Sequence, residues 1–179
     1  TNSDVFNIGI GHFAGGSITT GTSNTLIGGL AGDAQTTASN NTAVGYASLG
    51  TNTTGAGNVA VGRESLFNNT TASNNTAVGL NSLYTNTTGA NNVAVGKDAL
   101  IASTTANNNT AVGYDCLQAN TTGASNVAVG KSALEANTTG SANAALGADA
   151  LASNTTASNN TAVGTNSLNA NTTGSENVA

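Results

Sequence analysis

The sequence predicts an all-β fold, a parallel β-solenoid (β-roll or β-helix) of about ten coils with 17 residues in each coil. The first supporting observation is an unbroken repeat, because glycines recur every 17 residues from Gly11 to Gly164. The second is composition, because Asn supplies 29 and Thr 30 of the 179 residues. The third is the short period: two helices and a turn need about 33 residues, and Asn, Thr and Gly are poor helix formers. We therefore expect residues 1–179 to form a single repeat array, a segment of a longer fibre.

Charged residues make up only 6% of the chain, against about 25% in an average globular domain. The chain has three Lys or Arg, a net charge of −5 and a single cysteine, Cys116. Nucleic-acid binding requires clustered cations that neutralise phosphates, and three cations do not suffice. No apolar run reaches the ~18 residues of a membrane helix. The composition therefore argues against nucleic acid as a partner, against membrane insertion and against an intrachain disulfide.

Each repeat can be numbered from the Asn that starts the motif Asn-(Thr/Val)-Ala-Val-Gly, so that Asn is position 1 and Gly is position 5. Position 9 is Leu from Leu49 to Leu168, and positions 13 and 14 are Thr in every repeat. Position 2 alternates between Thr and Val from Thr42 to Val127, and position 6 carries all the cations. Loops tolerate insertions, and this repeat has none. Every residue of the unit is therefore expected to have a fixed place on a stacked coil.

The segment from position 1 to position 4, as in residues 58–61, is predicted to be a strand because it alternates and is β-branched. Glycine at position 5 predicts a turn with positive φ. A second turn is expected at the Thr-Thr-Gly stretch of positions 13–15. Each unit should then contain two or three short strands that hydrogen-bond to the coils on either side.

Stacking places identical side chains about 4.8 Å apart in successive coils. At that spacing Asn amides can hydrogen-bond from one coil to the next as a ladder, and Thr hydroxyls can do the same. The scarcity of charge follows, because a repeated charge would meet its own copy. Ten coils predict a rod about 50 Å long.

Val at position 4 and Leu at position 9 are the only dependable large apolar residues of the unit. Neighbouring strand residues face opposite ways, so an interior filled by positions 2 and 4 places the Ala of position 3 outside, as in Ala43, Ala60 and Ala77. A constant outer row of small apolar residues predicts close packing against other copies of the chain, in a homotrimer or a filament. The alternative is that this Ala is small in order to fit a flattened coil.

The motif Asn-Val-Ala-Val-Gly at residues 58–62, 92–96 and 126–130 resembles the Ser-Val-Ala-Ile-Gly repeats of trimeric autotransporter adhesin heads. The fuller unit, as in residues 41–49 and 52–55, is similar to repeats of tail-fibre-type proteins of phages and bacteria. The first resemblance implies a left-handed parallel β-roll with three chains side by side. It covers the whole chain, but the adhesin-head unit is shorter by three residues. The family has no catalytic residues that could be transferred to this chain.

The sequence offers no catalytic, cofactor-binding or metal-binding group. His12 is expected at the surface, and Cys116 takes a position otherwise held by Ser or Ala, which predicts a small buried residue. Asp98 and Asp115, on adjacent coils, are expected to form a solvated pair, with capture of a cation as the alternative.

Asn at position 12 precedes Thr-Thr and so forms a sequon for N-glycosylation in a secreted eukaryotic protein. The candidate glycosylation sites are Asn52, Asn69, Asn86, Asn120, Asn137, Asn154 and Asn171. The alternative is that an Asn- and Thr-rich chain makes sequons by chance and that laddered Asn side chains are inaccessible.

These observations predict a structural protein without enzymatic activity or cofactor, the shaft of an extracellular fibre, filament, surface adhesin or tail fibre. Its expected partner is a further copy of itself, and surface glycans are a second candidate. Its expected location is the cell surface, a secreted filament or a virion fibre. Two alternatives use the Thr and Asn rows of the solenoid: ice binding and glycan binding.

Overall fold

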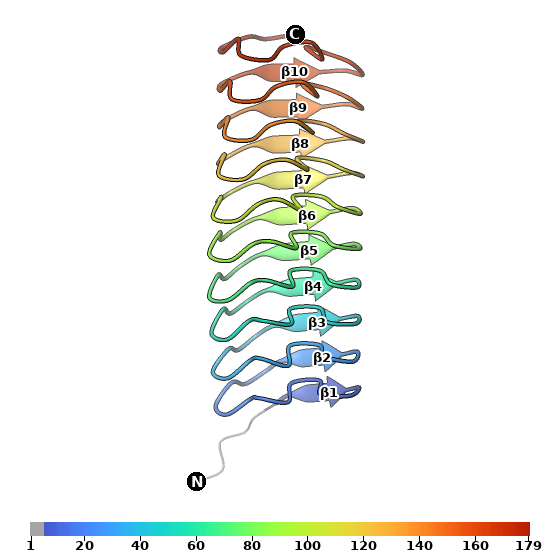
Figure 1. The fold of residues 1–179 in the computed structure, drawn as a ribbon, viewed down its shortest axis with the longest axis vertical. Helices are drawn as coiled ribbons and strands as arrows, with labels where there is room; N and C mark the ends of the chain where they lie inside the picture. The colour runs from blue at the N-terminus through green and yellow to red at the C-terminus, as the bar shows by residue number, and fades with distance from the viewer. Residues whose placement is uncertain (1–5) are drawn as a thin grey trace.

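The computed structural model describes residues 6–179, which form one straight stack of coils with Phe6 and Ala179 at opposite ends of the rod (Figure 1). Each coil contributes one three-residue strand, and the strands form a ten-stranded parallel sheet in chain order. The strands are β1 (Ile8–Ile10), β2 (Thr25–Ile27), β3 (Thr42–Val44), β4 (Val59–Val61), β5 (Thr76–Val78), β6 (Val93–Val95), β7 (Thr110–Val112), β8 (Val127–Val129), β9 (Ala144–Leu146) and β10 (Thr161–Val163).

The pairing register confirms the 17-residue coil. Ala43 lies opposite Ala60, Ala60 opposite Ala77, and the same offset holds for all nine strand pairs. The segments outside the strands are bonded between coils as well: the Leu66 amide donates to the Ser82 carbonyl over 2.9 Å, and the Thr53 amide to the Thr70 carbonyl over 2.9 Å. The all-β solenoid predicted from the repeat is therefore the fold of this chain.

The prediction of two or three strands per coil was wrong, because each coil has one strand, at positions 2–4. The rest of the coil is kept from extending by left-handed residues at positions 7, 9 and 17, such as Glu64 (φ 55°), Leu66 (φ 53°) and Asn74 (φ 61°). A residue with φ near +60° turns the chain out of the β region. The return path is consequently a series of turns that still bond to the neighbouring coils.

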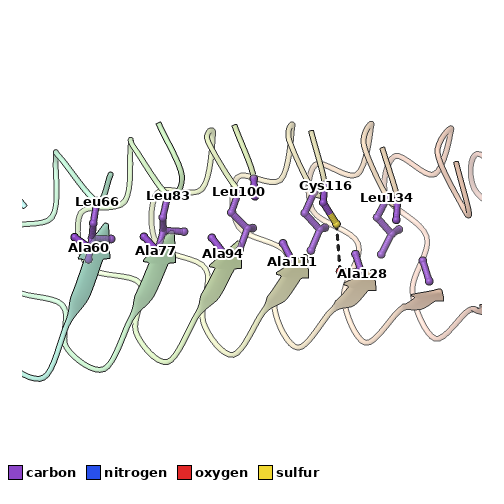
Figure 2. Close-up of a cluster of buried hydrophobic side chains, with 14 of the residues drawn as sticks. Ala60, Leu66, Ala77, Leu83, Ala94, Leu100, Ala111, Cys116, Ala128 and Leu134 are labelled. Atoms are coloured by element: carbon purple, nitrogen blue, oxygen red, sulfur yellow. Dashed lines mark hydrogen bonds between the residues drawn. The ribbon is translucent and has the colours of Figure 1, made fainter. Parts of the chain in front are cut away.

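The prediction for the two faces of the strand was also wrong. Position 3 points into the coil and positions 2 and 4 point out, because Ala60 is fully buried while Val59 and Val61 are only half-buried. Figure 2 shows the reason: the Ala of each strand faces the Leu of position 9, which reaches across from the return segment. Leu66, Leu83 and Leu100 are fully buried. In so thin an interior the residue opposite Leu has to be small, so the flattened-coil explanation of the Ala row is correct.

In the second coil the large and small residues are exchanged: Leu26 stands at position 3, on the strand, and Gly32 at position 9, on the return segment. Leu26 is 1% exposed, and a Cβ added to Gly32 would lie 2.9 Å from its Cδ2 atom. Leu26 therefore fills from the strand side the space that Leu fills from the return side in later coils. Gln35, at position 12, also leans over Gly32, with its Nε2 atom 2.6 Å from the same Cβ position.

Glycine at position 5 has the positive φ that the sequence predicted, between 127° and 143° in all ten coils. A side chain at position 5 would be unfavourable for two reasons. The positive φ strains any residue with a Cβ, and a Cβ on Gly79 would lie 2.6 Å from the Gly96 carbonyl carbon of the next coil. Gly164 has the same kind of φ, 127°, but a Cβ on it would meet nothing within 4 Å.

We expect Gly79→Val to destabilise the chain much more than Gly164→Val. Both substitutions cost about 1–3 kcal/mol for the strained φ. Only Gly79→Val also forces the backbone of the next coil to move. Urea unfolding of the two variants measures the difference, and equal losses would contradict the steric explanation.

We expect Leu26→Ala to cost about 2–5 kcal/mol, because it opens a cavity beside Gly32. Gly32→Leu alone should also destabilise, by overpacking against Leu26 and Gln35. The triple change Leu26→Ala, Gly32→Leu, Gln35→Asn recreates the Ala-Leu-Asn set of Ala43, Leu49 and Asn52 and should recover most of the stability. Additive losses in urea unfolding would refute the exchange of sizes.

Candidate functional site

The Asn side chains of position 12 lie inside the coil and form a ladder. The Nδ2 atom of Asn69 donates to Oδ1 of Asn52 over 2.9 Å, and Asn86 donates in the same way to Asn69 over 2.9 Å. Each Nδ2 also donates to the position-15 carbonyl of its own coil, as from Asn52 to Gly55 over 2.9 Å. The candidate glycosylation sites Asn52, Asn69, Asn86, Asn120, Asn137 and Asn154 are all 0% exposed.

This placement argues against N-glycosylation of the folded chain, because the amide nitrogen that would carry the sugar is buried and already donates hydrogen bonds. Asn171, in the last coil, is half-buried, and its Nδ2 atom donates to the Gly174 carbonyl over 2.8 Å. The structure thus places the candidate residues in two stretches of ladder, one from Asn52 to Asn86 and one from Asn120 to Asn171, where Asn171 donates to Asn154 over 3.3 Å.

The Asn side chains of position 1 form a second buried row. Oδ1 of Asn58 accepts from the backbone amide of Asn75 over 3.0 Å, and Nδ2 of Asn58 donates to the Ala72 carbonyl over 2.9 Å. The Ala72 carbonyl also accepts from Asn69 over 3.0 Å. In six of the ten coils both Asn rows therefore converge on one carbonyl, a contact that has no signature in the sequence.

The two Thr rows have different environments. The position-13 hydroxyls donate to the carbonyl of the same position in the next coil, as from Thr53 to Thr70 over 3.0 Å. The position-14 threonines, such as Thr54 and Thr88, are exposed in every coil. The folded chain therefore presents a single outward Thr row, whereas the Asn row two places earlier in the chain is buried and does not lie beside it.

Positions 6 and 7 form an edge of the rod where all three cations lie. Arg63 pairs with Glu64 over 3.2 Å, and Lys97 pairs with Asp98 over 2.6 Å. The Lys97 ammonium also lies 5.0 Å from the centre of the Tyr114 ring. The pKa of Lys97 is raised, first by the hydrogen bond to Asp98 and further by the negative charge of the same carboxylate.

The expectation of a solvated Asp98–Asp115 pair was wrong for Asp98. Its Oδ2 atom is neutralised by Lys97, and its Oδ1 atom accepts from Asn81 over 3.0 Å. Lys97 thus pairs with Asp98 alone, whereas the Oδ1 atom of Asp115 is buried and has no hydrogen-bond partner. Within residues 6–179 no group of three or more His, Cys, Asp or Glu side chains is arranged to hold a metal ion.

His12 and Cys116 lie far apart, in coils six repeats from one another, so their placement does not form a nucleophile and base pair. His12 is exposed, as expected, and its ring packs edge-on against Phe13 with centroids 4.3 Å apart. Cys116 is 0% exposed, as expected, and its thiol donates to the Ala128 carbonyl (Figure 2). Burial raises the pKa of this thiol from 9.0 to about 12.

The described part of the rod has no surface pocket. Among residues 6–179 no helix is long and apolar enough to cross a membrane. Comparisons with protein-family models, with curated proteins and with solved structures gave no match to this chain.

We expect the stability of the chain to fall as the pH rises from about 9 towards 12, because of Cys116. The unfolded thiol loses its proton near its ordinary pKa, whereas the folded thiol keeps its proton, so deprotonation favours the unfolded state. Cys116→Ala, which matches Ala99 and Ala133 of other coils, removes the thiol and with it this loss of stability at high pH. Urea unfolding of both forms at about pH 8 and about pH 11 measures it. The same pH dependence in both forms would contradict the assignment.

Proposed function

We propose that this chain is the shaft of an extracellular fibre, a passive structural element of a filament, surface adhesin or tail fibre. The observation that carries the proposal is the use of interior polar groups for stacking. The side chains of both buried Asn rows hydrogen-bond to a neighbouring coil and to a carbonyl of their own coil, so that neighbouring coils satisfy each other's buried polar groups. Such a stack is stiff and can be lengthened by adding units. The resemblance to adhesin-head repeats supports the extracellular setting.

The proposal includes self-association, in a homotrimer or a filament, through the outer face of the sheet. The Ala row does not supply the contact surface, since it is buried within each chain. The outer face instead carries two rows of mostly β-branched residues at positions 2 and 4, with no charged side chain among them. Val127 is 47% exposed, Leu146 52% and Val163 60%. An uncharged row of this kind, continuous over ten coils, is the surface best suited to meet another copy.

The exposed position-14 threonines support a second candidate, recognition of ice or of a glycan along the rod. Ten hydroxyls at the coil spacing of about 4.8 Å form one regular row. Aromatic side chains that stack on sugars are few, and Phe67 and Tyr84 stack on one another with centroids 5.5 Å apart. The shaft is therefore the first proposal and surface recognition the second.

Light scattering and small-angle X-ray scattering of the 179-residue chain test the shaft. We expect an elongated particle about 50 Å long per array and a mass above that of one chain. The variant Val61→Lys, Val95→Lys should be monomeric, because it places charge on the outer sheet face. The matched control Thr88→Lys, Thr122→Lys adds the same charge to the Thr row and should leave the assembly intact.

A monomeric parent chain would contradict the proposed self-association. Turnover of a substrate, tight binding to a defined glycan, or thermal hysteresis in ice assays would contradict the passive shaft. Loss of either binding activity in Thr88→Lys, Thr122→Lys would then assign it to the Thr row.

A further inference from the structure

The position-12 ladder is interrupted once along its length, at Ser103. Below the interruption Asn86 donates to Asn69, and above it Asn137 donates to Asn120, each over 2.9 Å. Ser103 lies between these two stretches, is 0% exposed, and its Oγ atom has no hydrogen-bond partner. At the interruption a buried hydroxyl therefore receives no hydrogen bond from the Asn ladder.

The polar atoms on both sides of Ser103 are fixed by the bonds they already make. Nδ2 of Asn86 donates to Oδ1 of Asn69 and to the Gly89 carbonyl, over 2.9 Å each. Both partners only accept, so the Asn86 amide cannot be turned round. Its Oδ1 atom, which elsewhere in the ladder accepts from the next coil, is buried without a partner.

The coil above contributes a donor in the same way. Nδ2 of Asn120 donates to the Gly123 carbonyl over 3.0 Å, but it makes no ladder bond of the kind that Asn137 and Asn154 make. Its second hydrogen is directed to the place where an Asn at position 103 would present Oδ1. An acceptor from below and a donor from above therefore meet at Ser103.

The same place also has an under-used carbonyl. In six of the seven coils with Asn at position 12 the position-15 carbonyl accepts from both Asn rows, as Ala72 does from Asn58 and Asn69. The Ala106 carbonyl accepts from Asn92 alone, over 2.8 Å. Serine is shorter than asparagine by two non-hydrogen atoms, so Ser103 fills less of the position-12 space than an asparagine does in the neighbouring coils.

We propose that this gap is a buried binding site for one water molecule. The water donates to Oδ1 of Asn86 and to the Ala106 carbonyl, and it accepts from Nδ2 of Asn120 and from the Ser103 hydroxyl. Two donors and two acceptors around the place of the missing side-chain amide match a single water, which needs two to four polar partners. The water replaces the missing side-chain amide and connects the two stretches of the ladder.

Gln35 provides an internal contrast. Its Nε2 and Oε1 atoms are also buried without partners, and it too stands at position 12. Its side chain is longer than that of Asn and fills the space over Gly32, since its Nε2 atom lies 2.6 Å from the point where a Cβ on that glycine would be. The proposal therefore depends on the missing volume at Ser103 as well as on its unpartnered atoms.

The test is a high-resolution crystal structure of the full 179-residue chain, beside that of Ser103→Asn. We expect the parent to hold an ordered water within hydrogen-bond distance of Asn86 Oδ1 and Ser103 Oγ. In Ser103→Asn we expect the water to be displaced and the new amide to bond directly to Asn86 and Asn120. The melting temperature of the variant should rise by about 2–4 °C, as one added hydrogen bond gives in a chain of this size.

Asn69→Ser is the matched control, because it opens the same kind of gap inside an intact stretch of ladder, between Asn52 and Asn86. We expect it to acquire a second ordered water and to melt at a lower temperature. A direct bond from Ser103 to Asn86 with no water in the parent would overturn the proposal, as would a dry gap in Asn69→Ser. Should Asn69→Ser not fold, the parent and Ser103→Asn structures decide the question between them.

Discussion

In six of the ten coils the position-15 carbonyl accepts hydrogen bonds from two buried asparagines, and this contact fixes how the coil closes. In one representative coil the Gly55 carbonyl accepts from Asn41 and from Asn52, each over 2.9 Å. An unpaired buried amide costs free energy comparable to the bonds it has lost, so both asparagines have to reach this atom. The distance along the chain from position 1 to position 12 and on to position 15 is thereby fixed. An inserted residue would leave at least one amide unsatisfied, and this explains why the 17-residue period is unbroken.

The second constraint is the thinness of the interior, which admits one large side chain per coil. Most coils meet it with Ala on the strand and Leu on the return segment, as in Ala60 and Leu66. The second coil meets it the other way, with Leu26 on the strand and Gly32 opposite. The two solutions share a backbone, because Gly32 (φ 55°) and Leu66 (φ 53°) have the same left-handed conformation. Total volume is therefore what the coil requires, and the side from which it is filled is free to change.

The period, the positive φ of glycine at position 5 and the Asn ladder could all be predicted from the sequence, because each follows from strict recurrence at one spacing. The inner face of the strand could not, because Val61 and Leu66 are both large and apolar, and alternation defines two faces without saying which is inside. The number of strands was missed because left-handed Leu66 and Glu64 are residue types that ordinarily avoid positive φ. The ion pair of Lys97 with Asp98 could not be predicted, because adjacent residues of an extended chain point opposite ways, whereas Asp98 (φ 56°) is left-handed and its side chain meets that of Lys97.

The division of labour between inside and outside also limits where recognition can occur. The buried Asn side chains already make hydrogen bonds within and between coils, so a partner can contact only the exposed rows of side chains. Position 14 is Thr in every coil and so presents the same hydroxyl along the whole rod. Position 6, on another edge, changes from Tyr46 to Arg63, Leu80 and Lys97. The fold tolerates this variation because the position-6 side chains are exposed and take no part in the hydrogen bonds between coils. A repeated row suits a repeated partner, such as another copy of the rod, while the edge of positions 6 and 7 is where one part of the rod differs from the next. Any contact that has to occur at a single height along the shaft therefore depends on that edge.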